Sequence, residues 1–560
     1  MDLWKLIITL HLSSRGFSGK PLAKRPEGHF IRDATGIVRR LSALDVFALT
    51  ILLIGFNAGF VFYDYYLGVF QGTNIPLAIL LAALPCIPIA LFYWLMTVAF
   101  PRTGGDYIWT SRILHPSVAF ANNFLFVVLV GVSLAASTGY FVYETQTLLN
   151  LLSLWFQSPG LSAAANMVTR QPWFAVVATV YLLVVCLLTT ERTLGRVALI
   201  GFVLNVTAVI LVFIEYLPVT PAYFQSQFNS WAGSSSSYQA IIDAAARDGF
   251  NRSSSPAWLL MAAMFIFGLY YGGYNWGSFY SGEIREVRKT IPIVFLGAVA
   301  TTAIVWYASS LLLWYRIGPD FLSAVSYLKY SHPDAPEVKL LEGFPMSRMF
   351  YLTFLLPAGP IGLLAKLLIV LGATWFFYYM WNLSFVLVIS RQIFAWSFDR
   401  ILPSSLADIS QGGWMRGPLK ALLITVLIAL VVSAFASVIP SILELTAVWG
   451  LVQLLVFCLP GLAGILMPFV RRDLFESVPS LATRRIGSVP VISLLGLLTT
   501  VISLFGAYEI FINPLLGGST GWDWVVEIFA VGFVFYWASY FIRKSQGIDL
   551  ALSMKEIPPE

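Results

Sequence analysis

The stretch Gly55-Phe56-Asn57-Ala58-Gly59 interrupts a long apolar run near the start of the chain, and Gly268-Leu269-Tyr270-Tyr271-Gly272-Gly273 interrupts another near its middle. Glycine destabilises a helix by about 1 kcal/mol relative to alanine. Inside a bilayer, a broken helix also leaves backbone groups that only protein, water or a ligand can satisfy. Breaks at corresponding places in two halves of a chain are typical of inverted-repeat secondary transporters, which bind substrate there. The two stretches therefore predict a substrate site near the middle of a membrane.

The composition indicates a membrane protein. Of the 560 residues, 58% are hydrophobic and only 11% are charged, and the mean hydropathy is +0.80. Soluble domains carry about 25% charged residues, and a bilayer core is crossed by about 20 apolar residues. The sequence predicts an all-α polytopic membrane protein with about 12 transmembrane helices, near 42–70, 76–99, 117–149, 173–190, 195–217, 257–281, 292–316, 359–391, 419–438, 441–470, 489–513 and 522–542.

The distribution of basic residues orients these helices. Most of the 34 Lys and Arg residues fall in alternate connecting segments, on the side that also holds both termini. Basic residues concentrate on the cytoplasmic side of membrane proteins, so we expect a multi-pass protein of the cell membrane with both termini cytoplasmic. The net charge of +6 is spread over many short loops, which gives no reason to expect a nucleic-acid partner.

The order of the predicted helices suggests two halves of five helices each. The Ser234–Ser237 run lies in the long segment between them and predicts a flexible outer loop. The expected organisation is a cytoplasmic N-terminal tail (1–40), a first five-helix repeat (41–217), an extracellular loop (218–256), a second five-helix repeat (257–470), helices 11 and 12 (471–542) and a cytoplasmic C-terminal tail (543–560).

Three predicted cytoplasmic segments carry a family resemblance. They read FPRTGGDY (100–107) after the second span, GEIREVRKTIP (282–292) after the sixth and SRQIFAWSFDRILP (390–403) after the eighth. In order and spacing they resemble the amino acid–polyamine–organocation (APC) superfamily of permeases, and the tail GIDL (547–550) with EIPPE (556–560) resembles that of prokaryotic amino acid permeases. The resemblance covers roughly residues 35 to 560.

This resemblance implies a LeuT-like, five-plus-five inverted repeat in which helices 1 and 6 are broken. Free amide groups at the breaks would then face a substrate carboxylate, and free carbonyl groups its ammonium group. The family's Gly-aromatic-acid signature falls on Gly273, Tyr274 and Asn275, so an amide replaces the acid. The expected substrate-binding residues are Gly55, Phe56, Asn57, Ala58, Gly59, Tyr270, Tyr271, Gly272, Gly273, Tyr274 and Asn275. The alternative is that the glycines only permit close helix packing.

Asn205 is the candidate coupling site. In some relatives a lysine of the fifth span occupies the place that sodium takes in others, and Asn205 stands at the matching position here. An amide releases no proton at physiological pH, so this proton route is not supported. The eighth span has no serine or threonine pair at the matching depth, so sodium is not indicated either. Protons carried elsewhere or a counter-substrate remain as candidates. With Asn275, Asn205 favours neutral over basic amino acids.

Four charged residues in the cytoplasmic segments are candidates for an inner gate: Asp106, Glu283, Arg391 and Asp399. Ion pairs between them would close the inner vestibule and would have to break when it opens, so their strength would set the conformational equilibrium. The alternative is that these charges only anchor helix ends at the lipid headgroups.

Three further ionisable residues fall inside predicted spans, namely Asp64, Glu144 and Lys366, all in the outer third. Charged groups inside a membrane are costly and are functional hypotheses by default. We expect Lys366 to pair with Asp64 or Glu144, as an outer gate or proton relay. The alternatives are a static pair or a lysine that reaches to the interface.

These observations favour a secondary transporter that moves an amino acid or related small amine by alternating access. Its partners are a small-molecule substrate and the lipid bilayer; no cofactor and no metal are expected. A membrane enzyme would need clustered catalytic residues, yet His11, His29, His115 and His332 all lie in tails or loops. The remaining alternative is a transporter-like sensor or a subunit of a membrane complex, which would bind the ligand without transporting it.

Overall fold

The structure is a computed structural model that describes residues 36–61, 63–189, 193–233, 236–252, 255–269, 271–339, 362–410, 417–436, 448–513, 518–555 and 557. Within these ranges nearly all regular structure is helical. The strands there are β1 (Arg485–Ile486) and β2 (Val489–Pro490), which form one antiparallel hairpin.

Nine helical segments of the described residues are long and apolar enough to cross a membrane. They are Ala43–Phe60, which joins α2 (Ala43–Ile54) to the start of α3 (Ala58–Val61); α5 (Ile75–Ala99); Pro116–Ser153 within α7 (Pro116–Phe156); α10 (Leu194–Tyr216); Pro256–Ser278, which begins with α13 (Pro256–Leu269); α14 (Val287–Ile317); α22 (Trp449–Val470); α25 (Val491–Phe511); and Gly521–Ser545 within α26 (Gly518–Ser545).

The other predicted spans also coincide with helices, but these helices are bent, interrupted or short. Helix α9 (Trp173–Leu188) meets α8 (Pro159–Val168) at 80° and makes a tenth span if the bent pair is counted as one. The eighth predicted span contains α18 (Leu363–Val370), a π-helical turn η4 (Leu371–Trp375) and α19 (Phe376–Phe398), and the ninth contains α20 (Leu419–Ala436). The prediction of an all-α polytopic membrane protein is confirmed; the inverted repeat stays a prediction.

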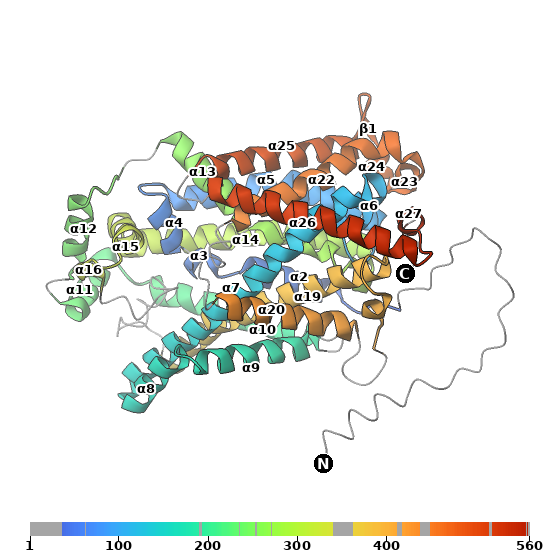
Figure 1. Cartoon of the computed structure of the whole chain (residues 1–560). Coiled ribbons are helices and arrows are strands. Elements are labelled where there is room, and N and C mark those ends of the chain that lie inside the picture. The colour runs from blue at the N-terminus through green and yellow to red at the C-terminus, as the bar shows by residue number, and fades with distance from the viewer. Residues whose placement is uncertain are drawn as a thin grey trace, which may run out of the picture.

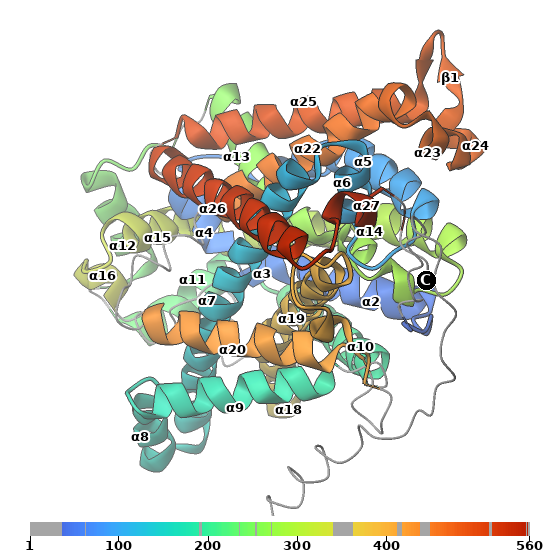
Figure 2. The same cartoon turned by 45° about the vertical axis from the view of Figure 1, so that its right-hand side comes forward.

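The helices pack in two groups that meet at the first span. Helix α5 contacts α13 and α14, and α14 also contacts α2; α19 and α20 contact α7 and α9. Helix α2 touches both groups, since it packs on α14 as well as on α10 and α19. Helix α25 lies along α22, and α26 packs across α7 (Figures 1 and 2).

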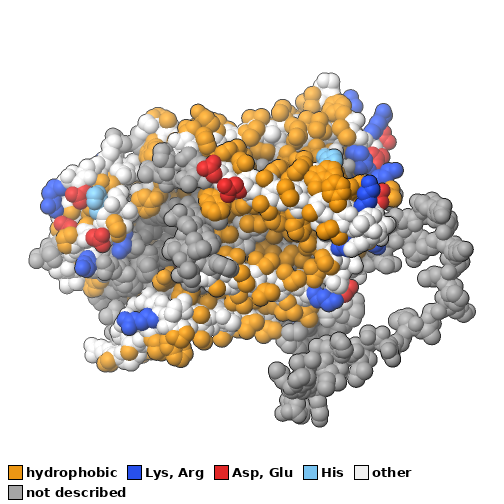
Figure 3. Space-filling model, in the orientation of Figure 1, with side chains coloured by type: hydrophobic (Ala, Val, Ile, Leu, Met, Phe, Trp, Pro, Cys, Tyr) orange, Lys and Arg blue, Asp and Glu red, His pale blue; other side chains and the backbone are white. Residues whose placement is uncertain are grey.

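The surface divides into an apolar middle and two charged ends. Figure 3 shows hydrophobic side chains over the middle of the molecule, with Lys, Arg, Asp and Glu gathered mostly at its two ends. Exposed apolar side chains on α9, α25 and α26 include Val180, Leu504 and Val534. Apolar surface of this extent is expected where helices face lipid tails.

The two ends carry the shorter elements. One end holds α11 (Pro221–Ala232), α12 (Tyr238–Arg247), α15 (Pro319–Ser331) and α16 (Pro336–Lys339), and the other holds the hairpin, α23 (Arg472–Ser477), α24 (Ser480–Thr483) and α27 (Leu550–Ser553) (Figures 1 and 2). The remaining elements are α4 (Tyr63–Val69), α6 (Asp106–Ile113) and the short turns η1 (Tyr271–Gly273), η2 (Trp276–Ser278), η3 (Ser281–Glu283) and η5 (Ser404–Ala407).

The segment 218–256 differs from its prediction as a flexible loop. Its described residues contain α11 and α12, and each helix starts at a hydroxyl side chain that accepts a hydrogen bond from a backbone N–H, Thr220 for α11 and Ser237 for α12. Such caps stabilise a helix start by about 1 kcal/mol. The apolar faces are buried on the neighbouring α15, where Tyr238 stacks on Phe321 at 4.3 Å between ring centroids. The serine run suggested a flexible linker, whereas its last residue, Ser237, caps α12.

Candidate functional site

The first span is broken at Gly55. Helix α2 ends there because Gly55 has a φ of 87°, in the left-handed region, which residues other than glycine rarely adopt. A Cβ at this position would lie 2.6 Å from Cε2 of Phe377. The carbonyl of Gly55 accepts a hydrogen bond of 2.8 Å from Nε1 of Trp306 in α14, and the chain becomes helical again at Ala58. The predicted break is thus present and is fixed by side chains of other spans.

The sixth span is broken just after Leu269. In place of a continuous helix, the three short turns η1, η2 and η3 follow, and the N–H of Tyr274 donates to the carbonyl of Tyr271. A Cβ on Gly273 would lie 2.7 Å from Cγ of Leu53 in α2. The two broken spans therefore touch each other where Gly273 meets Leu53. Tyr270 lies outside the described residues.

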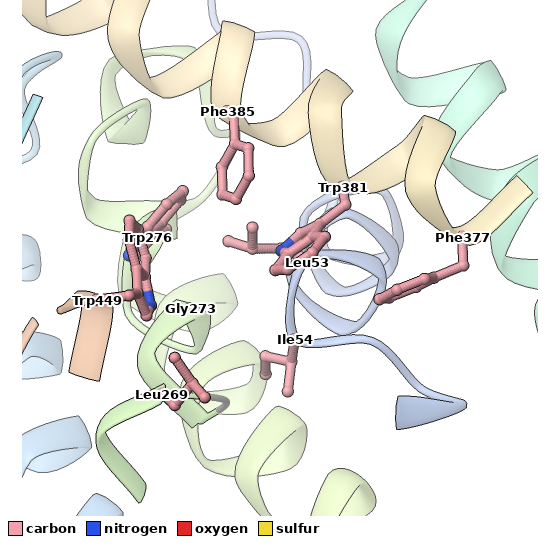
Figure 4. A pocket seen from close by; sticks show the side chains of 9 residues that line it. All are labelled: Leu53, Ile54, Leu269, Gly273, Trp276, Phe377, Trp381, Phe385 and Trp449. Carbon is pink, nitrogen blue, oxygen red and sulfur yellow. The ribbon is translucent and has the colours of Figure 1, made fainter. Parts of the chain in front are cut away.

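A small cavity lies beside this contact. It is lined by side chains of four spans: Leu53 and Ile54 from α2, Leu269, Gly273 and Trp276 from the sixth span, Phe377, Trp381 and Phe385 from α19, and Trp449 from α22 (Figure 4). Its volume is about 20 Å³, enough for about one water molecule. Five of the nine lining residues are aromatic, and none is ionisable.

Asn275 is the polar group next to this cavity in the chain. It lies between Gly273 and Trp276, which both line the cavity, and it is 1% exposed. Neither Nδ2 nor Oδ1 of Asn275 has a hydrogen-bond partner in the described part of the chain, and the same holds for the hydroxyl of Tyr274. An unpaired buried polar group costs about 1–3 kcal/mol, and a ligand or an ordered water would satisfy the amide of Asn275.

Asn205, in the continuous helix α10, contacts two irregular segments of other spans. Its Nδ2 donates to Oδ1 of Asn57, in the break of the first span, at 3.2 Å. It also lies 3.1 Å from the carbonyl oxygen of Gly372 in the π-helical turn of the eighth span. The predicted coupling position therefore lies where spans 1, 5 and 8 meet. An N–H donor there points at oxygen atoms that a cation would otherwise use.

Glu283 and Arg391 form a buried ion pair. Nε of Arg391 donates to Oε1 of Glu283 at 2.7 Å, and the second terminal nitrogen donates to Oε2 at 3.1 Å. The side chains are 5% and 2% exposed. The pair links η3, which follows the sixth-span break, to α19. Such two-pronged contacts are among the strongest polar interactions in proteins.

Asp399 pairs with Arg112, which the sequence analysis did not single out. The guanidinium donates at 2.8 Å to Oδ2 and at 2.7 Å to Oδ1 of Asp399, and both side chains are fully buried. The hydroxyl of Tyr107 also donates to Oδ2 at 2.9 Å. Arg112 and Tyr107 lie on α6, so this pair ties α6 to the end of α19. No local signal in the sequence pointed to Arg112, which lies 287 positions from Asp399.

Asp106 makes no ion pair among the described residues, unlike the other three candidates for the inner gate. Its side chain is buried, with 4% of the residue exposed, and it accepts a hydrogen bond of 2.8 Å from the hydroxyl of Tyr93 in α5. Burial raises the pKa of the Asp106 carboxyl from its ordinary value of 3.8 to about 7, and the hydrogen bond from Tyr93 acts in the opposite direction. The expected ion pair is replaced by a contact with a neutral group.

Lys366 contacts a carboxylate that was not among the predicted partners. Its Nζ lies 3.2 Å from Oε1 of Glu215 near the end of α10, with exposed fractions of 10% and 5% for the two side chains. Glu144 is buried in α7, and the side chain of Asp64 lies outside the described atoms. Pairing of Lys366 with either of them stays a prediction. Glu215 escaped notice because it stands close to the predicted span end, where charges are common.

Comparisons with known proteins identify the family of this chain. The family model described as "Amino acid permease" matches residues 41–536. The chain is 24% identical over 291 residues to "Uncharacterized protein 399" of Sulfolobus islandicus rod-shaped virus 1. That match covers 51% of this chain and 60% of the viral protein.

Proposed function

Because the chain belongs to the amino acid permease family, we propose that it is a secondary transporter that carries amino acids across the membrane by alternating access. The observation that carries this proposal is the contact between the two broken spans, where Gly273 packs on Leu53 beside a small cavity. Where broken helices meet at mid-membrane, free backbone groups from both halves of the chain are available to bind a substrate. The LeuT-like inverted repeat, the mid-membrane site and the cytoplasmic termini belong to this proposal.

The helix contacts support a division into a moving bundle and a scaffold. In this proposal the bundle contains spans 1, 2, 6 and 7, which is supported by the packing of α14 on α5 and α2 and of α13 on α5. The scaffold contains spans 3, 4, 8 and 9, which is supported by the packing of α19 and α20 on α7 and α9. Relative rocking of such groups exposes a fixed site to one side of the membrane at a time.

Two buried ion pairs form the inner gate in this proposal. Glu283–Arg391 connects the moving sixth span to α19 of the scaffold, so this pair must break when the two groups separate. Arg112–Asp399 connects α6, which follows the second span, to the same helix. Removing one member of a buried pair costs about 3–5 kcal/mol, since the other charge is left without a partner. Both pairs are made in the closed arrangement, so they favour it until substrate binding shifts the equilibrium toward opening.

Asn205 leads us to propose that transport is not coupled to sodium. Sodium prefers a cage of oxygen ligands, and the N–H groups of Asn205 take up the oxygens of Asn57 and Gly372. Protons bound elsewhere or exchange against a counter-substrate are the remaining drivers.

A pair of glycine substitutions tests the proposed site. A Cβ on Gly273 would overlap Leu53 at 2.7 Å, whereas a Cβ on Gly297 in α14 would lie 3.5 Å from Phe47, an ordinary contact. In proteoliposomes we expect Gly273→Ala to reduce amino acid uptake at least tenfold while Gly297→Ala transports like the wild type. Equal uptake by both variants at equal protein amounts would overturn the placement of the site at the breaks.

A further inference from the structure

The side chains that line the cavity at the two breaks are mostly hydrocarbon. Its side chains are leucine, isoleucine, phenylalanine and tryptophan, and their polar atoms are limited to indole N–H groups. We propose that this cavity takes the side chain of a zwitterionic amino acid that is uncharged and apolar, either aromatic or branched aliphatic. This choice of substrate rests on the transport function proposed above and narrows it.

The aromatic walls touch one another, so a substrate has to separate them. The ring of Trp276 lies 5.8 Å from Phe385 and 6.0 Å from Trp449, and Phe385 lies 6.0 Å from Trp449, between centroids. Trp381 extends the group, with its ring 5.3 Å from that of Phe385. Figure 4 shows these rings around the side chain of Leu53. A cavity that holds about one water molecule admits a side chain only when these rings move apart.

An apolar side chain replaces the contacts that the rings lose, whereas a charged one does not. A flat or branched hydrocarbon between two rings restores van der Waals contact and excludes water. A carboxylate or guanidinium in the same place would lose its hydration without a counter-charge, because no lining residue is ionisable. Glu283 and Arg391 do not line the cavity and are paired with each other.

The substrate's head group is matched by Asn275. A free amide offers a donor, Nδ2, to a carboxylate and an acceptor, Oδ1, to an ammonium group, and both atoms of Asn275 are buried and without a partner in the described residues. The amide adds no charge, so it suits a head group whose own charges cancel. A carboxylate at this position would favour a cationic amine instead.

A binding panel tests the side-chain preference directly. We would measure dissociation constants of the purified full-length protein for L-phenylalanine, L-leucine, L-serine, L-glutamate, L-arginine and L-lysine by ligand-dependent thermal shift and by equilibrium binding. L-phenylalanine or L-leucine should bind at least tenfold more tightly than the other four. Tighter binding of L-arginine or L-lysine would mean that the tryptophan faces attract a cation, and would overturn the proposal, as would a preference for L-serine or L-glutamate.

Two substitutions give readouts that a loss of folding does not imitate. Trp449→Phe enlarges the cavity at α22, so the affinity for L-tryptophan relative to L-phenylalanine should rise about tenfold. The control Trp522→Phe, on an exposed side chain of α26, should leave that ratio unchanged. Asn275→Asp should favour phenylethylamine, which lacks the carboxylate, over L-phenylalanine by about tenfold, since like charges repel. Unchanged ratios in both test variants would contradict the assignment.

Counterflow in proteoliposomes separates this inference from the transport function. Transport of a polar or charged amino acid, with no effect of apolar ones, would sustain the proposed function and overturn the substrate class. Tight binding of L-phenylalanine or L-leucine without counterflow would do the reverse: the substrate class would stand, and the protein would be a sensor. Absence of both binding and counterflow for all six amino acids would overturn both proposals.

Discussion

Asn205 and Asn57 share a hydrogen bond of 3.2 Å between Nδ2 and Oδ1, and this bond joins the fifth span to the break in the first. The same Nδ2 reaches the carbonyl of Gly372 at 3.1 Å. A neutral donor thus stands between two oxygen atoms, both of them buried at the meeting point of three spans.

This arrangement predicts that transport does not depend on sodium. Uptake into proteoliposomes should be equal in sodium chloride and in choline chloride. Asn205→Asp replaces the donor by a carboxylate beside the oxygens of Asn57 and Gly372, which creates an all-oxygen cluster suited to a hard cation. We expect this variant to become dependent on sodium or on acidic pH, while Asn166→Asp, on an exposed position of α8, behaves as the wild type. A wild-type protein that requires sodium would contradict this account.

The ion pair between Glu283 and Arg391 predicts a conformational effect. Glu283→Gln leaves a buried guanidinium without its carboxylate, which should destabilise the closed inner side by about 3–5 kcal/mol. A cysteine placed at the buried Ser278, in a background without the three native cysteines, should then react with a thiol reagent at least tenfold faster.

The exposed pair of Glu286 and Lys289 supplies the control for this experiment. Its side chains are 67% and 80% exposed, and surface pairs contribute at most about 1 kcal/mol. Glu286→Gln should therefore leave the reaction rate of the cysteine nearly unchanged. Equal acceleration in both variants would show that the buried pair does not hold the inner side closed.

Asp106 predicts a pH dependence of stability. Its pKa is raised from 3.8 to about 7 by burial, so the folded protein holds this proton more tightly than the unfolded chain does. The stabilisation from this group is complete below about pH 4 and is lost as pH rises through about 7. The melting temperature of the wild type should therefore fall between pH 5 and 8 relative to Asp106→Asn. The surface variant Asp408→Asn should leave the slope unchanged; equal slopes for wild type and Asp106→Asn would refute the assignment.

Lys366 and Glu215 predict strong coupling between two substitutions. Lys366→Met leaves a buried carboxylate unpaired, at a cost of about 3–5 kcal/mol. Adding Glu215→Gln removes that charge and should restore most of the lost thermal stability. We expect the double variant to transport with the wild-type pH profile, as a static pair requires. Loss of the pH dependence in Lys366→Met or in the double variant would instead support a proton relay through this pair.

The sequence predicted the breaks and the helices better than it predicted the partners. The breaks at Gly55 and Gly273 could be found from the sequence because glycine marks them. The structure shows why glycine is needed there: a Cβ at either position would overlap a neighbouring side chain. The hydropathy pattern located the helices, since a lipid environment demands long apolar runs. Arg112 and Asp399 are 287 positions apart, and charge alone does not tell which of several cations a carboxylate meets.

Two other features lacked any local signal. The π-helical turn Leu371–Trp375 brings the carbonyl of Gly372 to Asn205, yet its residues are ordinary ones for a membrane helix. The aromatic residues of α19 were visible in the sequence, but their cavity exists only where Phe377, Trp381 and Phe385 meet Trp449 and the broken spans. Such sites depend on how distant elements pack, which periodicity does not reveal.

Counterflow by the purified wild-type protein is the measurement that tests the transport claim most directly. Liposomes preloaded with a mixture of unlabelled amino acids would receive a trace of labelled L-phenylalanine or L-leucine outside. The account predicts transient accumulation of label above that of protein-free liposomes, without sodium and without an imposed potential. No accumulation for any labelled amino acid, with protein that still binds one of them, would contradict transport and identify a sensor or complex subunit.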